Sequence, residues 1–146
     1  VREFLSTTFM QERLPLIMDS VVGAGVKHCV IMSAYGVGDT LRSASFFMRV
    51  GCKIMMRSIF TDRAKADAMV AKYQPYISRV HPGLLTDKPG KGGVKVFDVA
   101  SVARVPGIPM IAREDVADAL LSIAGNPLNA GTDFLVTVDD VVLRAT

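Results

Sequence analysis

Apolar and polar positions near the start of the chain follow a helical period. The apolar residues recur at the spacing of one helix face: Leu14, Ile17, Met18, Val21 and Val22. Gly23 and Gly25 follow where a glycine commonly ends a helix. Thr8 to Gln11 has the form of a capping box, but Pro15 suits a first turn and moves the expected start toward Arg13. The pattern predicts a helix that ends near residue 23.

Two short apolar runs have the pattern of buried strands. Residues 28–33 show no alternation, as expected for a central parallel strand covered on both faces. Residues 76–81 form the second run, which Pro82 and Gly83 end. Both runs are short enough for strands, and each follows a segment with helical spacing. This alternation predicts a parallel sheet built from crossover units.

The segment between the two runs predicts helices. Residues 41–60 are rich in Met and Phe and indicate one or two short helices. A better defined helix, with apolar positions at Ala66, Met69, Val70 and Tyr73, is expected to start near Thr61 and to end before Pro75.

The last third of the chain also predicts strands and a helix. Residues 88–93 form a Gly- and Lys-rich loop, and residues 94–97 predict a small edge strand. Glu114 and Asp115 open a helix, where acids favour the positive end of the helix dipole. We expect Asp115 to accept backbone amides or to pair with Arg113, a structural role. Residues 134–138 are expected to form the last strand.

Length and composition fit one soluble domain over residues 1–146. Half of the residues are hydrophobic and 21% are charged. The net charge of +3 is scattered, so the chain lacks the basic footprint that nucleic-acid binding requires. No apolar run approaches the ~20 residues of a membrane span, and the chain opens without a signal-peptide pattern. We therefore expect a cytoplasmic protein with neither nucleic-acid nor membrane partners.

The titratable residues exclude several kinds of site. Cys29 and Cys52 lack metal-ligand spacing and are expected to be buried free thiols. His28 and His81 are far apart, so we expect no metal site. Neither a nucleophile elbow nor a late histidine is present for an acyl-transfer triad. The adjacent acids Glu114-Asp115 and Asp139-Asp140 fit a helix start and a solvated turn.

One glycine pair is similar to part of a phosphate-binding turn. Gly36-Val37-Gly38 follows the strand at 28–33 and precedes a potential helix. Leu41 occupies the place of the third glycine of a dinucleotide fingerprint, and no convincing acid follows about 20 residues later. The pair therefore only weakly favours a cofactor phosphate site.

Three strings together resemble the NmrA-like, atypical short-chain dehydrogenase/reductase family. Residues 25–38 are similar to the passage from a helix into the family's fifth strand, and residues 80–87 to its strand end "RPG", with His81 in place of arginine. Residues 111–121 are similar to its helix "i.reDVA.al". The resemblance covers most of the chain. It implies the C-terminal half of an α/β domain with a Rossmann-type parallel sheet and flanking helices, without its N-terminal strands.

The resemblance also implies a site and a cofactor. A nicotinamide cofactor, NADP or NAD, would lie across the C-terminal strand ends, and hydride would pass to a small carbonyl or conjugated substrate. Ser33 would be a catalytic residue near the nicotinamide. Tyr35 is the second catalytic candidate, because it could supply a phenol from the loop after the strand, with a packing or hydrogen-bonding role as the alternative. The residues expected to line the cofactor are Ser33, Ala34, Tyr35, His81, Pro82, Gly83 and Leu84.

Two departures from the family leave alternatives open. Ile59 and Arg63 stand where short-chain dehydrogenases have their catalytic tyrosine and lysine, so the usual acid–base chemistry is in doubt. The glycine-rich turn for the pyrophosphate would lie before Val1. The chain is then either a fragment or a relative whose sheet another chain, such as a second copy, completes. A cofactor-sensing or interaction module without turnover remains the alternative function.

Overall fold

The computed structural model describes residues 8–38, 40–45, 49–50, 57–107 and 109–144. Its helices are α1 (Phe9–Gly23), α2 (Thr40–Ser43), α4 (Arg57–Met69) and α5 (Arg113–Ala124), with 3-10 turns η2 (Ala71–Tyr76), η3 (Val99–Ser101) and η4 (Pro127–Asn129). The first four strands are β1 (Cys29–Met32), β2 (Ile77–Pro82), β3 (Leu84–Thr86) and β4 (Lys95–Asp98). The remaining strands are β5 (Val102–Arg104), β6 (Met110–Ala112), β7 (Asp133–Thr137) and β8 (Val142–Leu143).

The main sheet has the strand order β1-β2-β7-β4. β1, β2 and β7 are parallel, and β4 pairs antiparallel with β7 at the edge. This sheet with its flanking helices is the predicted α/β architecture. β1 is not central as predicted: among the described residues it forms an edge of the sheet, because β7 pairs with β2 and gives β2 the inner position. β7 is also not the last strand, since β8 follows it and pairs with β5.

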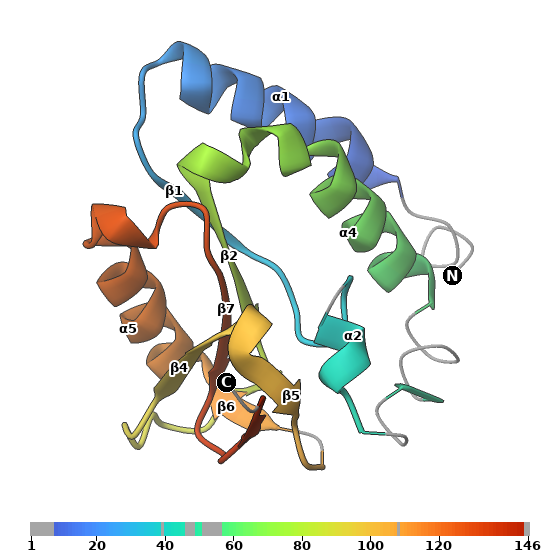
Figure 1. The fold of residues 1–146 in the computed structure, drawn as a ribbon, viewed down its shortest axis with the longest axis vertical. Coiled ribbons are helices and arrows are strands. Elements are labelled where there is room, and N and C mark those ends of the chain that lie inside the picture. The colour runs from blue at the N-terminus through green and yellow to red at the C-terminus, as the bar shows by residue number, and fades with distance from the viewer. Residues whose placement is uncertain (1–7, 39, 46–48, 51–56, 108, 145–146) are drawn as a thin grey trace.

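Helices cover both faces of the main sheet. α1 and α4 lie side by side on one face, and α5 lies on the other (Figure 1). Ile77 of β2 packs with Leu14, Met18, Ala66 and Val70 under the helix pair. The other face is apolar across β2 and β7 and packs on α5 through Val80, Ile111, Val116, Ala119, Ile123 and Val136. A parallel sheet covered on both faces reads as continuous apolar runs, as the sequence does here.

A third apolar cluster lies on the same face of the sheet as α1 and α4, but toward the C-terminal ends of β2 and β7. It consists of Tyr35, Ala44, Val102, Val105 and Leu135. Leu135 stands in register with His81 of β2, so their side chains share a face. Arg79 of β2 and Asp133 of β7 are also in register on this face. A polar strip therefore separates two apolar clusters on one face of the sheet.

The first helix starts earlier than its sequence indicates. α1 begins at Phe9, not near Arg13, and it continues through Pro15. The capping box predicted at residues 8–11 does not form, because the Thr8 side chain makes no cap hydrogen bond. Asp62 of α4 instead accepts the backbone amides of Met10 at 3.0 Å and Gln11 at 3.1 Å. A carboxylate distant in sequence thus satisfies amides that every helix start leaves unpaired.

Two other helix boundaries differ from the predictions. α4 begins at Arg57 instead of near Thr61, and Pro75 lies inside the turn η2 instead of beyond a helix end. The 3-10 form accommodates proline because this short turn contains few intrahelical bonds that need its missing amide. Of the segment 41–60, α2 is one short helix, and residues 46–48 and 51–56 lie outside the described residues.

The end of the chain follows the predictions more closely. β2 ends at Pro82, and the small strand expected at 94–97 is β4 at the edge of the sheet. β3 and β6 pair in a small parallel sheet that the sequence analysis did not predict.

Cys29 is a free thiol, as predicted, but it is half-buried instead of buried. Partial burial raises the pKa of its thiol.

α5 begins at Arg113 beside the two predicted acids. Asp115 is buried and accepts the backbone amides of Lys91 and Gly92 at 3.3 and 3.0 Å, and Glu114 accepts that of Gly90 at 2.8 Å. The structural role expected for Asp115 is confirmed, although its partners belong to the 88–93 loop. Arg113 pairs with Asp87 instead, at 2.7 Å. In the described ranges, no helix is long and apolar enough to cross a membrane.

The capping role of Asp62 predicts a large effect of one substitution. We expect Asp62→Ala to lower the free energy of unfolding by about 1–2 kcal/mol, as for the loss of a helix cap, because it leaves two amides of α1 unpaired. Urea unfolding followed by circular dichroism measures this change. Glu12→Ala is the matched control, since Glu12 only receives the exposed Thr8 hydroxyl, and it should change stability little. Equal losses in both variants would contradict the assignment.

Candidate functional site

Backbone pairing between β1 and β2 continues beyond the end of β1. The amide of Ser33 donates to the carbonyl of Val80 at 2.7 Å, and that of Tyr35 donates to Pro82 at 2.9 Å. The C-terminal ends of the two strands are therefore fixed against each other. Open α/β sheets bind their ligands at this end of their strands. Ser33 and His81, predicted to lie at the same end of the sheet, are brought together there.

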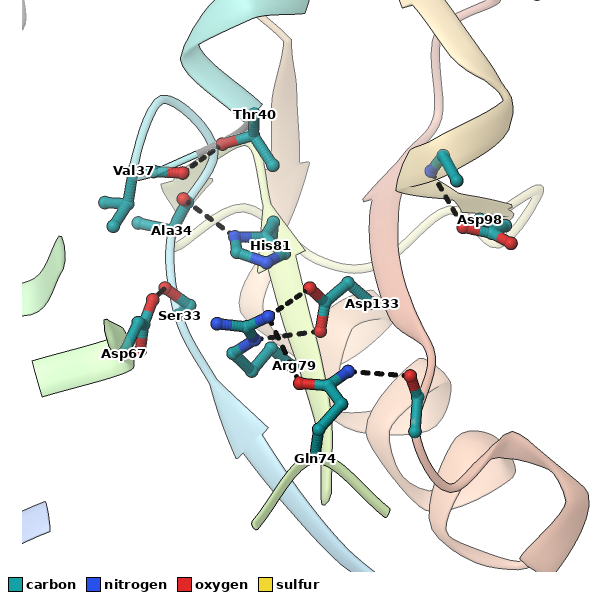
Figure 2. A network of polar contacts seen from close by, with 12 residues as sticks. Ser33, Ala34, Val37, Thr40, Asp67, Gln74, Arg79, His81, Asp98 and Asp133 are labelled. Atoms are coloured by element: carbon teal, nitrogen blue, oxygen red, sulfur yellow. Dashed lines mark hydrogen bonds and ion pairs between the residues drawn. The ribbon is translucent and has the colours of Figure 1, made fainter. Parts of the chain in front are cut away.

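Ser33 is tied to an acid that the sequence analysis did not single out. Its hydroxyl donates to Oδ2 of Asp67 in α4 at 3.0 Å (Figure 2). Both residues are buried, with 3% and 5% of their surfaces exposed. Burial raises the pKa of the Asp67 carboxyl, and the hydrogen bond from Ser33 and the charges of Arg79, His81 and Arg63 partly oppose that rise. The acid thus holds its proton to higher pH than an exposed aspartate does.

His81 is held in one orientation by the end of β1. Its Nδ1 lies 3.2 Å from the carbonyl oxygen of Ala34, and the ring is 4% exposed (Figure 2). Burial lowers its pKa, opposed by the Ala34 carbonyl and by Asp133 and Asp67. A carbonyl oxygen only accepts, so Nδ1 carries the hydrogen. In the neutral ring Nε2 is then a hydrogen-bond acceptor.

A paired arginine completes the polar strip on the sheet. Arg79 donates from Nε and Nη2 to the two carboxylate oxygens of Asp133 at 2.9 and 2.6 Å, and Nη2 also lies 3.3 Å from Oε1 of Gln74 (Figure 2). This two-point pairing fixes the guanidinium plane. It also compensates both charges where little solvent reaches them.

Two pockets flank this strip. One, of about 300 Å³, is lined by the Gly38 turn, by α4 and by Asp67, Arg79, His81 and Asp133. The other, of about 430 Å³, lies between η3 and the start of β7, and Asp133 and Val99 line both. The first pocket contains two buried titratable groups with shifted pKa values, Asp67 and His81, a combination typical of functional sites.

The other predicted site residues have mainly structural contacts. Tyr35 is 2% exposed, and its ring packs in the third apolar cluster. The amide of Gly83 donates to the carbonyl of Val136, and a Cβ at Gly83 would lie 2.5 Å from the Pro109 oxygen, so a close backbone approach accounts for this glycine. Pro82 is buried, whereas Leu84 is 53% exposed beyond the strand end.

The glycine pair after β1 forms a closed turn. Gly36 and Gly38 both have positive φ, which favours glycine, and the Gly36 amide donates to Oγ1 of Thr40 at 2.9 Å. That amide is therefore already paired. α2, which follows, is a helix of only four residues. The turn does not fit the pyrophosphate of a dinucleotide.

The residues at the family's tyrosine and lysine places lie on α4. Ile59 is 39% exposed, and a guanidinium nitrogen of Arg63 hydrogen-bonds the carbonyl oxygen of Met32 at the end of β1. Arg63 is thus anchored to the strand that carries Ser33. In the described residues, no group of three or more His, Cys, Asp or Glu side chains could hold a metal ion.

The fold and the strand-end geometry are those of a Rossmann-type nucleotide-binding domain. A model of the family described as NAD(P)H-binding matches residues 6–127, so the chain belongs to this family. No curated protein matches the sequence.

Solved structures share the fold at low sequence identity. A short-chain dehydrogenase/reductase from Veillonella parvula in complex with NADP is 13% identical with a TM-score of 0.69, and 85% of this chain covers 56% of it. ChuY, an anaerobillin reductase from Escherichia coli, is 18% identical with a TM-score of 0.65, at 85% and 56% coverage. The oxidoreductase ylbE from Lactococcus lactis is 16% identical with a TM-score of 0.58, at 82% and 50%. The chain thus spans about half the length of these proteins.

These residues fit the nicotinamide end of the cofactor but not its pyrophosphate. The paired strand ends and the exposed Leu84 offer a surface for the nicotinamide half. For the pyrophosphate, the one glycine pair that follows a described strand of the main sheet has its Gly36 amide committed to Thr40.

The raised pKa of Asp67 predicts how stability depends on pH. The folded state binds this proton more tightly than the unfolded chain, whose carboxyl has the ordinary pKa of 3.8. The contribution of Asp67 to stability is thus fully present below pH 3.8 and falls as the pH rises through the raised pKa. We expect Asp67→Asn, which cannot ionise, to be less destabilising at about pH 7 than at about pH 4.5.

Chemical unfolding of both proteins at the two pH values measures this difference. His81 acts in the opposite sense, because its lowered pKa costs stability as the pH falls below 6.5. It is present in both proteins, so only the part of its titration that depends on Asp67 differs between them. A penalty for Asp67→Asn that is larger at the higher pH would contradict a raised pKa.

Proposed function

We propose that this chain forms the nicotinamide-side half of an NAD(P)H-dependent reductase of the NmrA-like, atypical short-chain dehydrogenase type. The observation that carries the proposal is the pairing of Ser33 and Tyr35 with the end of β2, which creates one ligand-facing edge within a family that binds NAD(P)H. The cofactor, when bound, supplies a hydride to a small carbonyl or conjugated substrate.

In this proposal Ser33 polarises the oxygen of the substrate. As long as Asp67 is ionised, the Ser33 hydrogen is committed to it. A protonated Asp67, which its raised pKa favours, can instead donate to Ser33 Oγ and leave the hydroxyl hydrogen free for the substrate. Asp67 is then the positioning residue that sets which way Ser33 donates. Both side chains are buried.

Tyr35 is the weaker catalytic candidate. Its ring packs among apolar side chains on the face opposite α5, which favours a packing role. Ala34, His81, Pro82, Gly83 and Leu84 are proposed to line the nicotinamide, with Leu84 as the exposed contact.

The second candidate function is a cofactor-sensing module without turnover. Its support is the pair Ile59 and Arg63, since isoleucine cannot give a proton to a substrate and Arg63 is tied to the Met32 carbonyl. Cofactor preference between NADP and NAD is left open in both versions. We also propose that a second copy of the chain, or a partner chain, pairs with β1 and completes the sheet. The cytoplasmic location expected from the sequence stays a prediction.

Cofactor titration tests the proposal that this chain contacts the nicotinamide but does not hold the pyrophosphate. The isolated chain should bind NADPH or NADH at least about a thousandfold more weakly than a complete domain, because about three hydrogen bonds to the pyrophosphate, each ~1.5–3 kcal/mol, are missing. Isothermal calorimetry on both proteins measures the ratio. Micromolar binding by the isolated chain would refute this account and make the Gly36-Val37-Gly38 turn the phosphate site.

Substitution of Ser33 separates the reductase from the sensor. In a complete domain, we expect Ser33→Ala to lower kcat by about a hundredfold while cofactor affinity stays the same, since the hydroxyl acts on the developing charge of the substrate oxygen. Tyr35→Phe is the matched control and should leave kcat nearly unchanged. Binding of the cofactor with no turnover of any carbonyl substrate by the unsubstituted protein would favour the sensor.

A further inference from the structure

The pocket of about 300 Å³ on the face of the sheet is a built polar cavity. Arg79 and Asp133 form its floor, and Ala64, Ala68 and Ala71, from α4 and the turn after it, contribute an apolar wall without long side chains. Its size is at the lower end of small-molecule pockets, which are typically ~300–1,000 Å³.

Asp67 lines this pocket and has an acceptor atom without a partner. Its Oδ2 receives the Ser33 hydroxyl, but its Oδ1 is buried and has no hydrogen-bond partner among the described residues. The residue is 5% exposed and lines the pocket. A buried carboxyl oxygen without a donor is costly, and native proteins pair such atoms with few exceptions. A ligand donor would remove that cost.

His81 contributes a second acceptor to the same pocket. Its Nδ1 is committed to the Ala34 carbonyl, which leaves Nε2 with a lone pair in the neutral ring. The buried environment favours that neutral form. His81 and Asp67 both line the pocket, and each perturbs the titration of the other.

The charged floor is already paired. Arg79 bonds both oxygens of Asp133 and also Gln74, so neither charge of the pair is left to select an ion. The carboxyl groups on the lining disfavour an anion, and the nearby guanidinium disfavours a cation. The groups left for a ligand are the two acceptors.

We propose that this pocket binds a neutral molecule with two N–H or O–H donors, one for Oδ1 of Asp67 and one for Nε2 of His81. Cyclic ureas, lactams with a second donor and small diols have this chemistry. The site goes beyond the proposed reductase function, although it shares His81 with the proposed nicotinamide lining and Asp67 with the positioning of Ser33.

A pair of probes that differ only in their donors tests the proposal. 2-Imidazolidinone has two N–H groups, and 1,3-dimethyl-2-imidazolidinone has none. The chain contains only two histidines, so ¹⁵N NMR of histidine-labelled protein reports on the pocket directly. We expect saturable shifts of the His81 Nε2 signal with 2-imidazolidinone, with a dissociation constant on the order of 1 mM, as is ordinary for so small a ligand.

His28 is the internal control, because its Nε2 faces Ser78 at the opposite end of β1 and should not respond. Asp67→Leu should weaken binding at least about tenfold, the effect of losing one hydrogen bond to a charged or strongly polar group.

Three results would overturn the site: equal binding of the dimethyl probe, shifts confined to His28, or no saturation up to the solubility limit of 2-imidazolidinone. If Asp67→Leu does not fold, the two probes on the unsubstituted chain still decide. Failure here leaves the cofactor titration untouched, so loss of this site is distinguishable from failure of the proposed function.

Discussion

The parallel pairing of β1 with β2 is the constraint on which the site depends. Its register sets Met32 against Val80, and two more amides, those of Ser33 and Tyr35, extend the ladder past the strand. This extension carries the Ala34 carbonyl to His81 and the Ser33 hydroxyl to α4. A one-residue slip would turn each side chain to the other face and break both contacts. The geometry of the edge follows from backbone bonds rather than from any one side chain.

The polar strip on β2 and β7 follows from the same pairing. Arg79 and Asp133 meet because their positions are in register, and the pair separates two apolar clusters on one face. A buried ion pair is weak evidence for stability, since desolvation offsets much of the attraction. An apolar pair here would join the two clusters and fill the space above the sheet. The strip is therefore accompanied by a polar pocket on this face, at a cost in packing.

Local pattern predicted most of the elements. The apolar runs at 28–33 and 76–81 and the acids at Glu114 and Asp115 indicated β1, β2 and the start of α5, because each signal depends on neighbours in sequence. The start of α1 was missed because Asp62 caps it from a distant helix. β3 and β6 were missed because strands of three residues carry too little periodicity.

The residues of the candidate site also divide into those that the sequence indicated and those that depend on distant partners. The resemblance singled out Ser33 and His81, and their places at the ends of parallel strands predicted that they lie at the same end of the sheet. Asp67, Arg79 and Asp133 were not found, because each depends on a partner 34 or 54 positions away. One signal was available for Asp67: it is an acid directly after Ala66 and three positions before Val70, in the part of the helix that packs on the sheet. An acid at such a position needs a buried partner.

The central claim is that a nicotinamide lies across the C-terminal ends of β1 and β2. The most direct measurement is a crystal structure of a complete domain, with the preceding strands present, bound to NADP⁺. The account predicts the nicotinamide ring in van der Waals contact with the segment from Ser33 to Tyr35 and with Leu84, and the pyrophosphate on residues that precede this chain. A ring bound at the opposite strand ends, beside His28, or a pyrophosphate held by the turn at Gly36, would contradict it.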